Sequence, residues 1–313
     1  MGMKNRSDTQ IGAIYAGISY FLWGLLPVYW KLVDSVNPKE ILANRIFWSF
    51  IFMLIILLVT KKWGMLSATI KGFAKNRKQM FALIAASLLI SINWFVYIWS
   101  VNSGHMVEAS LGYYINPLVS ILLGTIVLKE KLTAAQYVSF ILAAVGVLII
   151  SIAHGQIPWI ALALAVTFGL YGLAKKLIQV DSSVGLALET LVVTPIAVLY
   201  MGYLFFKGTN AFIASPIGTD LLLMGAGIAT AVPLLYFAKG AQKIPLSLLG
   251  FIQYISPTIT LVLGVFVYHE SFSKIQLLSF IFIWSALTIF SLSKTKLFSE
   301  KGIKFRKEKS QSI

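Results

Sequence analysis

The sequence predicts an all-α integral membrane protein with about ten transmembrane helices, arranged as two inverted repeats of five helices. Three observations support this prediction: apolar blocks, a repeated stretch, and the distribution of basic residues. Of the 313 residues, 58% are hydrophobic and only 12% are charged, whereas a soluble domain carries about 25% charged residues. The apolar residues come in blocks of about 20, the length that crosses about 30 Å of hydrocarbon.

The repeated stretch lies in the middle of the chain and recurs near its end. When the sequence is shifted by 140 positions, 11 of the 32 residues from 110 to 141 are identical without a gap. Pro117 then falls on Pro257, a match that apolar bias does not explain. A period of this length indicates a duplicated unit. We expect two five-helix units and a basic cytoplasmic tail: 1–153, 154–293 and 294–313.

Ten apolar segments are expected to span the membrane, five in each unit. Their expected ranges are 11–33, 39–60, 80–101, 107–128, 133–152, 159–179, 184–206, 219–238, 246–268 and 274–293. The first is too long for the apolar core of a signal peptide and has no small-residue cleavage site, so we interpret it as a span.

Basic residues outside the spans predict the orientation. With the N-terminus in the cytoplasm, 21 Lys and Arg residues fall on the inner side and four on the outer side. An excess of basic residues marks cytoplasmic loops. We therefore expect a multi-pass protein of the bacterial inner membrane with both termini cytoplasmic. Because five is odd, the second unit enters from the opposite side, so the two units are inverted.

Inverted repeats are typical of secondary transporters, in which two similar halves exchange inward-open and outward-open conformations. A simpler alternative is that duplication only enlarged a bundle, since channels and enzymes also arise in this way. No phosphate-binding loop, hydrolase or zinc-peptidase motif is present, so we expect no catalytic residue and no enzyme. The net charge of +15 lies in loops and tails, which argues against a nucleic-acid partner.

Two prolines interrupt the fourth and ninth spans at equivalent positions. Pro117 and Pro257 lack an N–H group, which frees the carbonyl groups of Tyr113 and Gln253. Interrupted spans at matching points of two repeats are a pointer to a substrate site. The polar residues around the kinks are Tyr113, Tyr114, Asn116, Gln253, Tyr254 and Ser256. The alternative is a packing kink whose neighbours bond across helices.

Aromatic residues in the first and third spans suggest the walls of a cavity. Asn93, Trp94 and Tyr97 lie within the third span, and Tyr20 and Trp23 share a face of the first. An aromatic cavity with few polar anchors suits an amphipathic or aromatic small molecule. The alternative is anchoring at the membrane interface. We prefer that alternative for three tryptophans at span ends: Trp30, Trp63 and Trp159.

Four ionisable residues lie within spans, where charges are costly and mark function or pairing. They are Glu40, Arg45, Glu108 and Glu189. Arg45 is the deepest cation, and Glu40 and Glu108 are its candidate partners. A purely structural ion pair is the alternative. The three histidines are scattered in loops and there is no Cys, so we expect neither a metal site nor a cofactor.

Several segments closely resemble one known family. They are Tyr20-Phe21-Leu22-Trp23-Gly24, Glu40-Ile41-Leu42-Ala43-Asn44-Arg45, Asn93-Trp94, Glu108 to Leu118 and Gly250 to Thr258. Together with the inverted halves they resemble the RarD subfamily of EamA-type permeases, in the drug/metabolite transporter superfamily. The resemblance covers all but the two tails. It implies an inner-membrane permease with a central cavity between the halves, of the type described as chloramphenicol-sensitive.

These observations together favour a secondary carrier, more readily an exporter, for small amphipathic or aromatic metabolites or drugs. The cycle would be alternating access, with the two halves rocking around a midplane site. Its partners would be the lipid bilayer, a small-molecule substrate and, as one option for coupling, protons. Two other classes remain open: a passive channel or facilitator, and a membrane-embedded enzyme or assembly factor.

Overall fold

The chain folds into helices in the computed structural model, which describes residues 3–73, 75–102, 106–153, 155, 159–178, 180–269 and 273–293. No strand is present in these ranges, which confirms the all-α prediction. The helices are α1 (Met3–Lys31), α2 (Pro38–Val59), α3 (Trp63–Phe73), α4 (Arg77–Asn102), α5 (Met106–Ile126), α6 (Ala134–Ala153), α7 (Trp159–Leu177), α8 (Ser182–Lys207), α9 (Ile217–Lys243), α10 (Leu246–Gln253), α11 (Ile255–Phe266) and α12 (Lys274–Ser293).

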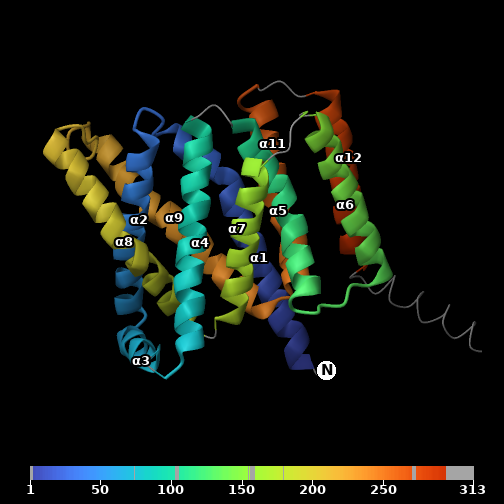
Figure 1. Cartoon of the computed structure of the whole chain (residues 1–313), viewed down its shortest axis with the longest axis horizontal. Coiled ribbons are helices and arrows are strands. Elements are labelled where there is room, and N and C mark those ends of the chain that lie inside the picture. Colours follow the sequence, from blue (N-terminus) through green and yellow to red (C-terminus); the bar gives the residue numbers. More distant parts are fainter. Residues whose placement is uncertain are drawn as a thin grey trace, which may run out of the picture.

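Each expected span coincides with a helix. Nine helical segments of the described chain are long and apolar enough to cross a membrane, and one of them runs through α10 and α11. The expected fourth span corresponds to α5, whose described apolar part, Leu111–Ile126, is shorter. Four spans, α2, α4, α5 and α6, lie between α1 and α7, and these two helices run in opposite directions (Figure 1). The architecture is therefore that of a multi-pass membrane bundle.

The two halves of the chain are interleaved rather than side by side. The most extensive contacts join α6 to α12, α5 to α7, α1 to α9 and α2 to both α8 and α9. Each of these pairs takes one helix from each half. Figure 1 shows α6 and α12 together at one end of the bundle, with the other spans forming the main body.

The crossing of α2 and α9 brings two backbones almost into contact. A Cβ atom added at Gly227 would lie 2.3 Å from the carbonyl carbon of Trp48 and 2.6 Å from the backbone nitrogen of Ser49. The Ser49 hydroxyl donates a hydrogen bond of 3.0 Å to the Gly227 carbonyl. Small residues permit such crossings in membranes, where van der Waals packing drives helix association.

Gly227→Ala is expected to lower the free energy of unfolding by about 1–3 kcal/mol, because backbone rather than a flexible side chain opposes the new methyl group. Gly202→Ala is the matched control, since no atom of the described residues lies within 4 Å of a Cβ atom there. Thermal unfolding of the purified variants measures the difference. Equal midpoints for the two variants would contradict the close crossing.

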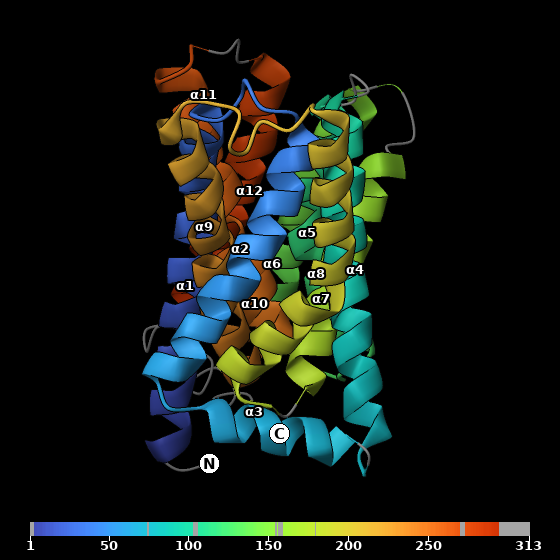
Figure 2. The ribbon, with the colours of Figure 1, turned by 90° about the vertical axis from the view of Figure 1, so that its left-hand side faces the viewer.

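Helix α3 was not expected, because the sequence predicted only a basic loop at this position. The helix lies across the ends of the spans (Figure 2), and none of its residues is buried. Lys62, just before α3, forms an ion pair of 2.7 Å with Asp181, the residue that caps α8. Burial alone would raise the pKa of Asp181, but Lys62 and two backbone N–H groups of α8 lower it overall. This contact fixes one end of α3 to the bundle.

Candidate substrate site

Helix α2 carries the first two predicted charges, and they have separate environments. The helix begins after Asn37, whose side chain accepts a hydrogen bond of 3.0 Å from the backbone N–H of Lys39. The buried Glu40 accepts bonds of 2.7 and 2.9 Å from the backbone N–H groups of Ala211 and Phe212. Its carboxylate therefore holds the loop between α8 and α9, so this candidate partner of Arg45 is engaged elsewhere. The side chain of Glu108, the other candidate, lies outside the described residues.

Arg45 lies two turns into α2 and is flanked by aromatic rings. Its guanidinium carbon is 4.9 Å from the ring centre of Trp30 and 4.7 Å from that of Trp94. Its Nε atom donates a hydrogen bond of 3.0 Å to the hydroxyl of Thr230. Four helices thus supply this centre: α1, α2, α4 and α9. Trp30, which we had interpreted as an interfacial anchor, is a direct neighbour of Arg45.

Two tyrosines extend this centre toward α5. The rings of Tyr97 and Tyr113 lie 6.0 Å apart in an edge-to-face arrangement, and both residues are close enough to Arg45 to interact with its charge. Tyr113 is 46% exposed although it lies within a spanning helix. We call Trp30, Arg45, Trp94, Tyr97, Tyr113 and Thr230 the arginine cluster. It combines one cation with flat apolar walls and an accessible phenol.

A second set of predicted residues is closed by aromatic packing. Tyr20 is only 2% exposed, and its hydroxyl donates to Gln253 Oε1 at 3.4 Å. The ring of Trp23 lies 5.4 to 5.7 Å from those of Tyr20, Phe168 and Phe237. We call Tyr20, Trp23, Phe168, Tyr171 and Phe237 the aromatic cluster. Its members pack against one another in this conformation.

A buried ion pair joins the aromatic cluster to α8. Lys175 Nζ lies 2.7 Å from Glu189 Oε1, and their side chains are 2% and 3% exposed. The Tyr171 hydroxyl donates a bond of 3.3 Å to Glu189 Oε2. The sequence interpretation missed Lys175, because it stands beside Lys176 at a span end and was counted with the cytoplasmic loop. The charge pattern alone could not distinguish a buried lysine from a solvated one.

A small cavity separates the ion pair from the arginine cluster. Its volume is about 10 Å³, and its lining includes Ser49, Trp94, Tyr171, Glu189 and Thr190. This is room for about one water molecule. Trp94 lines the cavity and also contacts Arg45, so it connects Arg45 with the Lys175–Glu189 pair.

The two prolines lie near the contact between α5 and α10. The helix is broken at Tyr254, between α10 and α11, and Pro257 lies in the first turn of α11, whereas α5 continues through Pro117. The hydroxyl of Tyr254 donates a bond of 3.3 Å to the carbonyl of Tyr114, its counterpart in the repeat. The two kinks therefore differ in the same conformation.

Two predicted amides near these helices differ in burial and in their contacts. The partly buried Asn93 donates bonds of 2.8 and 2.9 Å from Nδ2 to the carbonyl of Leu164 and the hydroxyl of Thr167, which ties α4 to α7. Asn116 is buried, and its Oδ1 atom has no hydrogen-bond partner among the described residues. Asn93 thus has a packing contact, while Asn116 leaves a polar atom unsatisfied beside Pro117.

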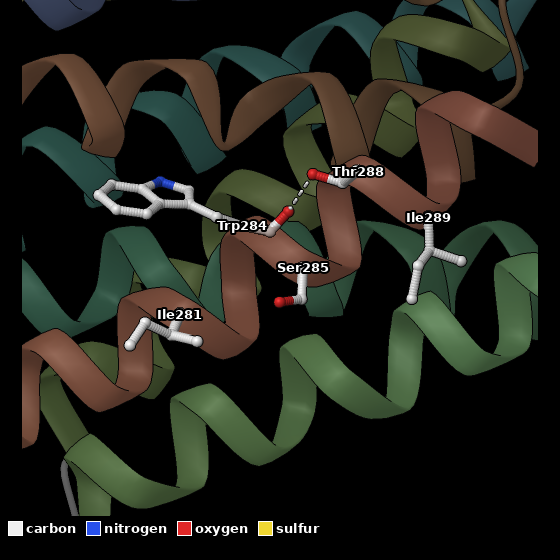
Figure 3. Close-up of a pocket in the computed structure, with 5 residues that line it drawn as sticks. All are labelled: Ile281, Trp284, Ser285, Thr288 and Ile289. Atoms are coloured by element: carbon white, nitrogen blue, oxygen red, sulfur yellow. Dashed lines mark hydrogen bonds between the residues drawn. The ribbon is translucent and has the colours of Figure 1, made fainter.

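A groove on the outside of α12 is a poorer candidate for the site. It has a volume of about 480 Å³ and is lined by Ile281, Trp284, Ser285, Thr288 and Ile289. Figure 3 shows these side chains on one helix, with the hydroxyl of Thr288 bonded to the carbonyl of Trp284. The groove is open on one side and offers no charge, so its position on a spanning helix suits contact with lipid tails.

Comparison with known proteins identifies the family. The model of the EamA-like transporter family matches residues 10–152 and again 157–292. The uncharacterized transporter YojE of Bacillus subtilis is 50% identical over 291 residues, which cover 93% of this chain and 96% of that protein. Protein RarD of Escherichia coli is 42% identical over 283 residues, covering 90% and 94%.

A solved crystal structure shares the fold at low sequence identity. Its TM-score is 0.67 at 18% identity, and the match covers 90% of this chain and 97% of that one. Both family-model matches and relatives above 40% identity extend along nearly the whole chain. The RarD resemblance is thereby confirmed, and the chain belongs to the EamA-like transporter family of membrane transporters.

Proposed function

We propose that the protein is a secondary carrier that exports a small amphipathic or aromatic solute across the bacterial cytoplasmic membrane by alternating access. The observation that supports this most directly is the arginine cluster, a charged aromatic centre within the spans whose Tyr113 side chain is 46% exposed. An ionisable residue within the spans marks a substrate pathway, and aromatic walls with few polar groups are typical of small-molecule sites.

The proposed orientation places Arg45 and the Lys175–Glu189 pair in opposite halves of the bilayer. With a cytoplasmic N-terminus, α2 begins at the outer surface, so Arg45 lies in the outer half of the bilayer. Helix α8 begins inside, so the Lys175–Glu189 pair lies in the inner half. The aromatic cluster and this buried pair close the inner route. We therefore interpret the conformation as one that is closed to the cytoplasm.

The helix packing favours two mixed bundles as the moving units. One contains α1, α9 and α11, and the other contains α4, α5 and α7, while α10, the first part of the ninth span, packs mainly against α5. Each bundle combines the third and fourth helices of one repeat with the first helix of the other. Because every sequence half contributes to both bundles, rocking would occur between these bundles rather than between the halves themselves.

Cysteine labelling tests the orientation, since the native chain has no Cys. A cysteine at Ile70, in α3, is expected to resist an impermeant thiol reagent in intact cells and to react after permeabilisation. Ile213→Cys is the matched control, because Ile213 is 70% exposed in the loop between α8 and α9, and it should react in intact cells. Labelling of position 70 in intact cells would refute the proposed orientation.

Transport in proteoliposomes separates the functional classes. The solutes are indole-3-acetate, indole-3-acetamide and tryptamine, each tested with and without an imposed proton gradient. Accumulation against a concentration gradient is expected of a coupled carrier. Equilibration without accumulation would favour the channel, and formation of a product without transport would favour the enzyme.

A further inference from the structure

We infer that the arginine cluster binds small aromatic carboxylates, and that Arg45 holds the carboxylate while its aromatic neighbours hold the ring. This inference rests on the proposed transport function and specifies its substrate class. It follows from how the donors of Arg45 are used and from what surrounds them.

Most hydrogen-bonding capacity of Arg45 is unused by the described part of the chain. A guanidinium has five N–H donors, and here only Nε is engaged, by Thr230 at 3.0 Å. Arg45 forms no ion pair with any described residue, and the nearby Glu40 is bonded to the loop between α8 and α9. The terminal nitrogens can therefore form the pair of parallel bonds that a carboxylate accepts.

The aromatic rings restrict how an anion can approach. The guanidinium lies over the rings of Trp30 and Trp94 within 5 Å of their centres. Ring contacts of this kind leave the edge of the guanidinium, where the donors point, as the open direction. A planar carboxylate matches that edge, and the rings of Tyr97 and the exposed Tyr113 offer aromatic faces to a flat apolar body.

The equivalent position in the second repeat shows the contrasting arrangement. Arg45 follows the cap of α2, Asn37, by eight residues, and Glu189 follows the cap of α8, Asp181, by eight. Glu189 is neutralised inside the protein by Lys175 at 2.7 Å. At the same distance from the helix cap, one charge thus has its counter-ion within the chain, whereas Arg45 has none among the described residues.

Three compounds with the same ring test the inference on the purified full-length protein. They are indole-3-acetate, indole-3-acetamide and tryptamine, which are anionic, neutral and cationic. Titration calorimetry should show that indole-3-acetate binds at least about tenfold more tightly than the amide, and that tryptamine binds most weakly. Equal affinities, or no binding of the acetate at millimolar concentration, would overturn the inference.

Variants of Arg45 then show which group holds the anion. Arg45→Gln should reduce the affinity for indole-3-acetate to that of the amide and leave the amide unchanged, which also shows that the variant is folded. Arg45→Lys should retain part of the preference, because it keeps the charge but loses the planar fork. Arg77→Gln, at the exposed start of α4, is the matched control. An unchanged preference for the acetate in Arg45→Gln would exclude Arg45 as the anion site.

Transport and binding separate this inference from the proposed function. Uphill transport of the amide or tryptamine without preference for the acetate would refute the carboxylate inference and leave the carrier intact. Specific acetate binding at Arg45 without any transport would refute the carrier and leave the binding site.

Discussion

Glu189→Ala is expected to destabilise the protein by about 3–5 kcal/mol, because it leaves the Lys175 ammonium buried without a counter-ion. Both side chains are almost fully buried, and the distance between them is 2.7 Å. Lys175→Ala should have a similar effect, since the carboxylate then keeps only the Tyr171 hydroxyl. The midpoint of thermal unfolding in detergent measures both losses.

Two controls distinguish burial from the loss of a charge. Asp8→Asn breaks the ion pair between Asp8 and Lys243, two side chains that are 50% and 38% exposed. It should lower the free energy of unfolding by at most about 1 kcal/mol. The double variant Lys175→Met with Glu189→Leu removes both charges and should recover most of the stability. If either single variant unfolds at the native midpoint, the pair does not hold α7 to α8.

Pro257→Ala is expected to shift the conformational balance far more than Pro117→Ala. The helix is interrupted at Tyr254, just before Pro257. Alanine at position 257 would allow α10 and α11 to join into one helix. Alanine is about 3 kcal/mol better than proline inside a helix, which corresponds to at most about a hundredfold change in an equilibrium. Helix α5 is already continuous through Pro117, so the same substitution there has less to change.

Reagent access at Tyr113→Cys measures this shift. The cysteine reports whether the arginine cluster is open, and its labelling rate should change strongly in the Pro257→Ala background and little in Pro117→Ala. The proline variants should still insert and bind detergent normally, which gel filtration checks. Equal rates in both backgrounds would reduce the kinks to packing features.

The fold was predictable because membrane composition constrains it so strongly. Each expected span coincides with a helix, since about 20 apolar residues must bond their own backbone in hydrocarbon. Helix α3 escaped prediction because its 11 residues are too short to cross and lie among basic residues. The helix break lies beside the repeated proline at Pro257, but no feature of the sequence predicts that the two copies differ.

The site was predictable only in part, because its geometry depends on contacts between distant segments. Arg45, Trp94 and Tyr113 were named as candidates in separate groups, and the structure places Trp94 against Arg45 and Tyr113 close to it. Thr230 and Trp30 were missed as partners of Arg45, since neither residue type marks such a contact in a span. Pairing between helices of different halves is fixed by packing, as where the Ser19 hydroxyl donates to the Pro233 carbonyl, 214 residues away. No local pattern records such contacts.

The interleaving of the halves has a consequence for biosynthesis. When the ribosome has completed α6, the helices inserted so far still lack their main partners, because α7, α8, α9 and α12 are not yet made. During that interval Glu40 lacks the backbone N–H groups of the loop between α8 and α9, and Arg45 lacks its hydrogen-bond acceptor, the Thr230 hydroxyl. A chain stopped after residue 153 should therefore be recognised by quality-control proteases. Its second half, supplied as a separate polypeptide, should protect it.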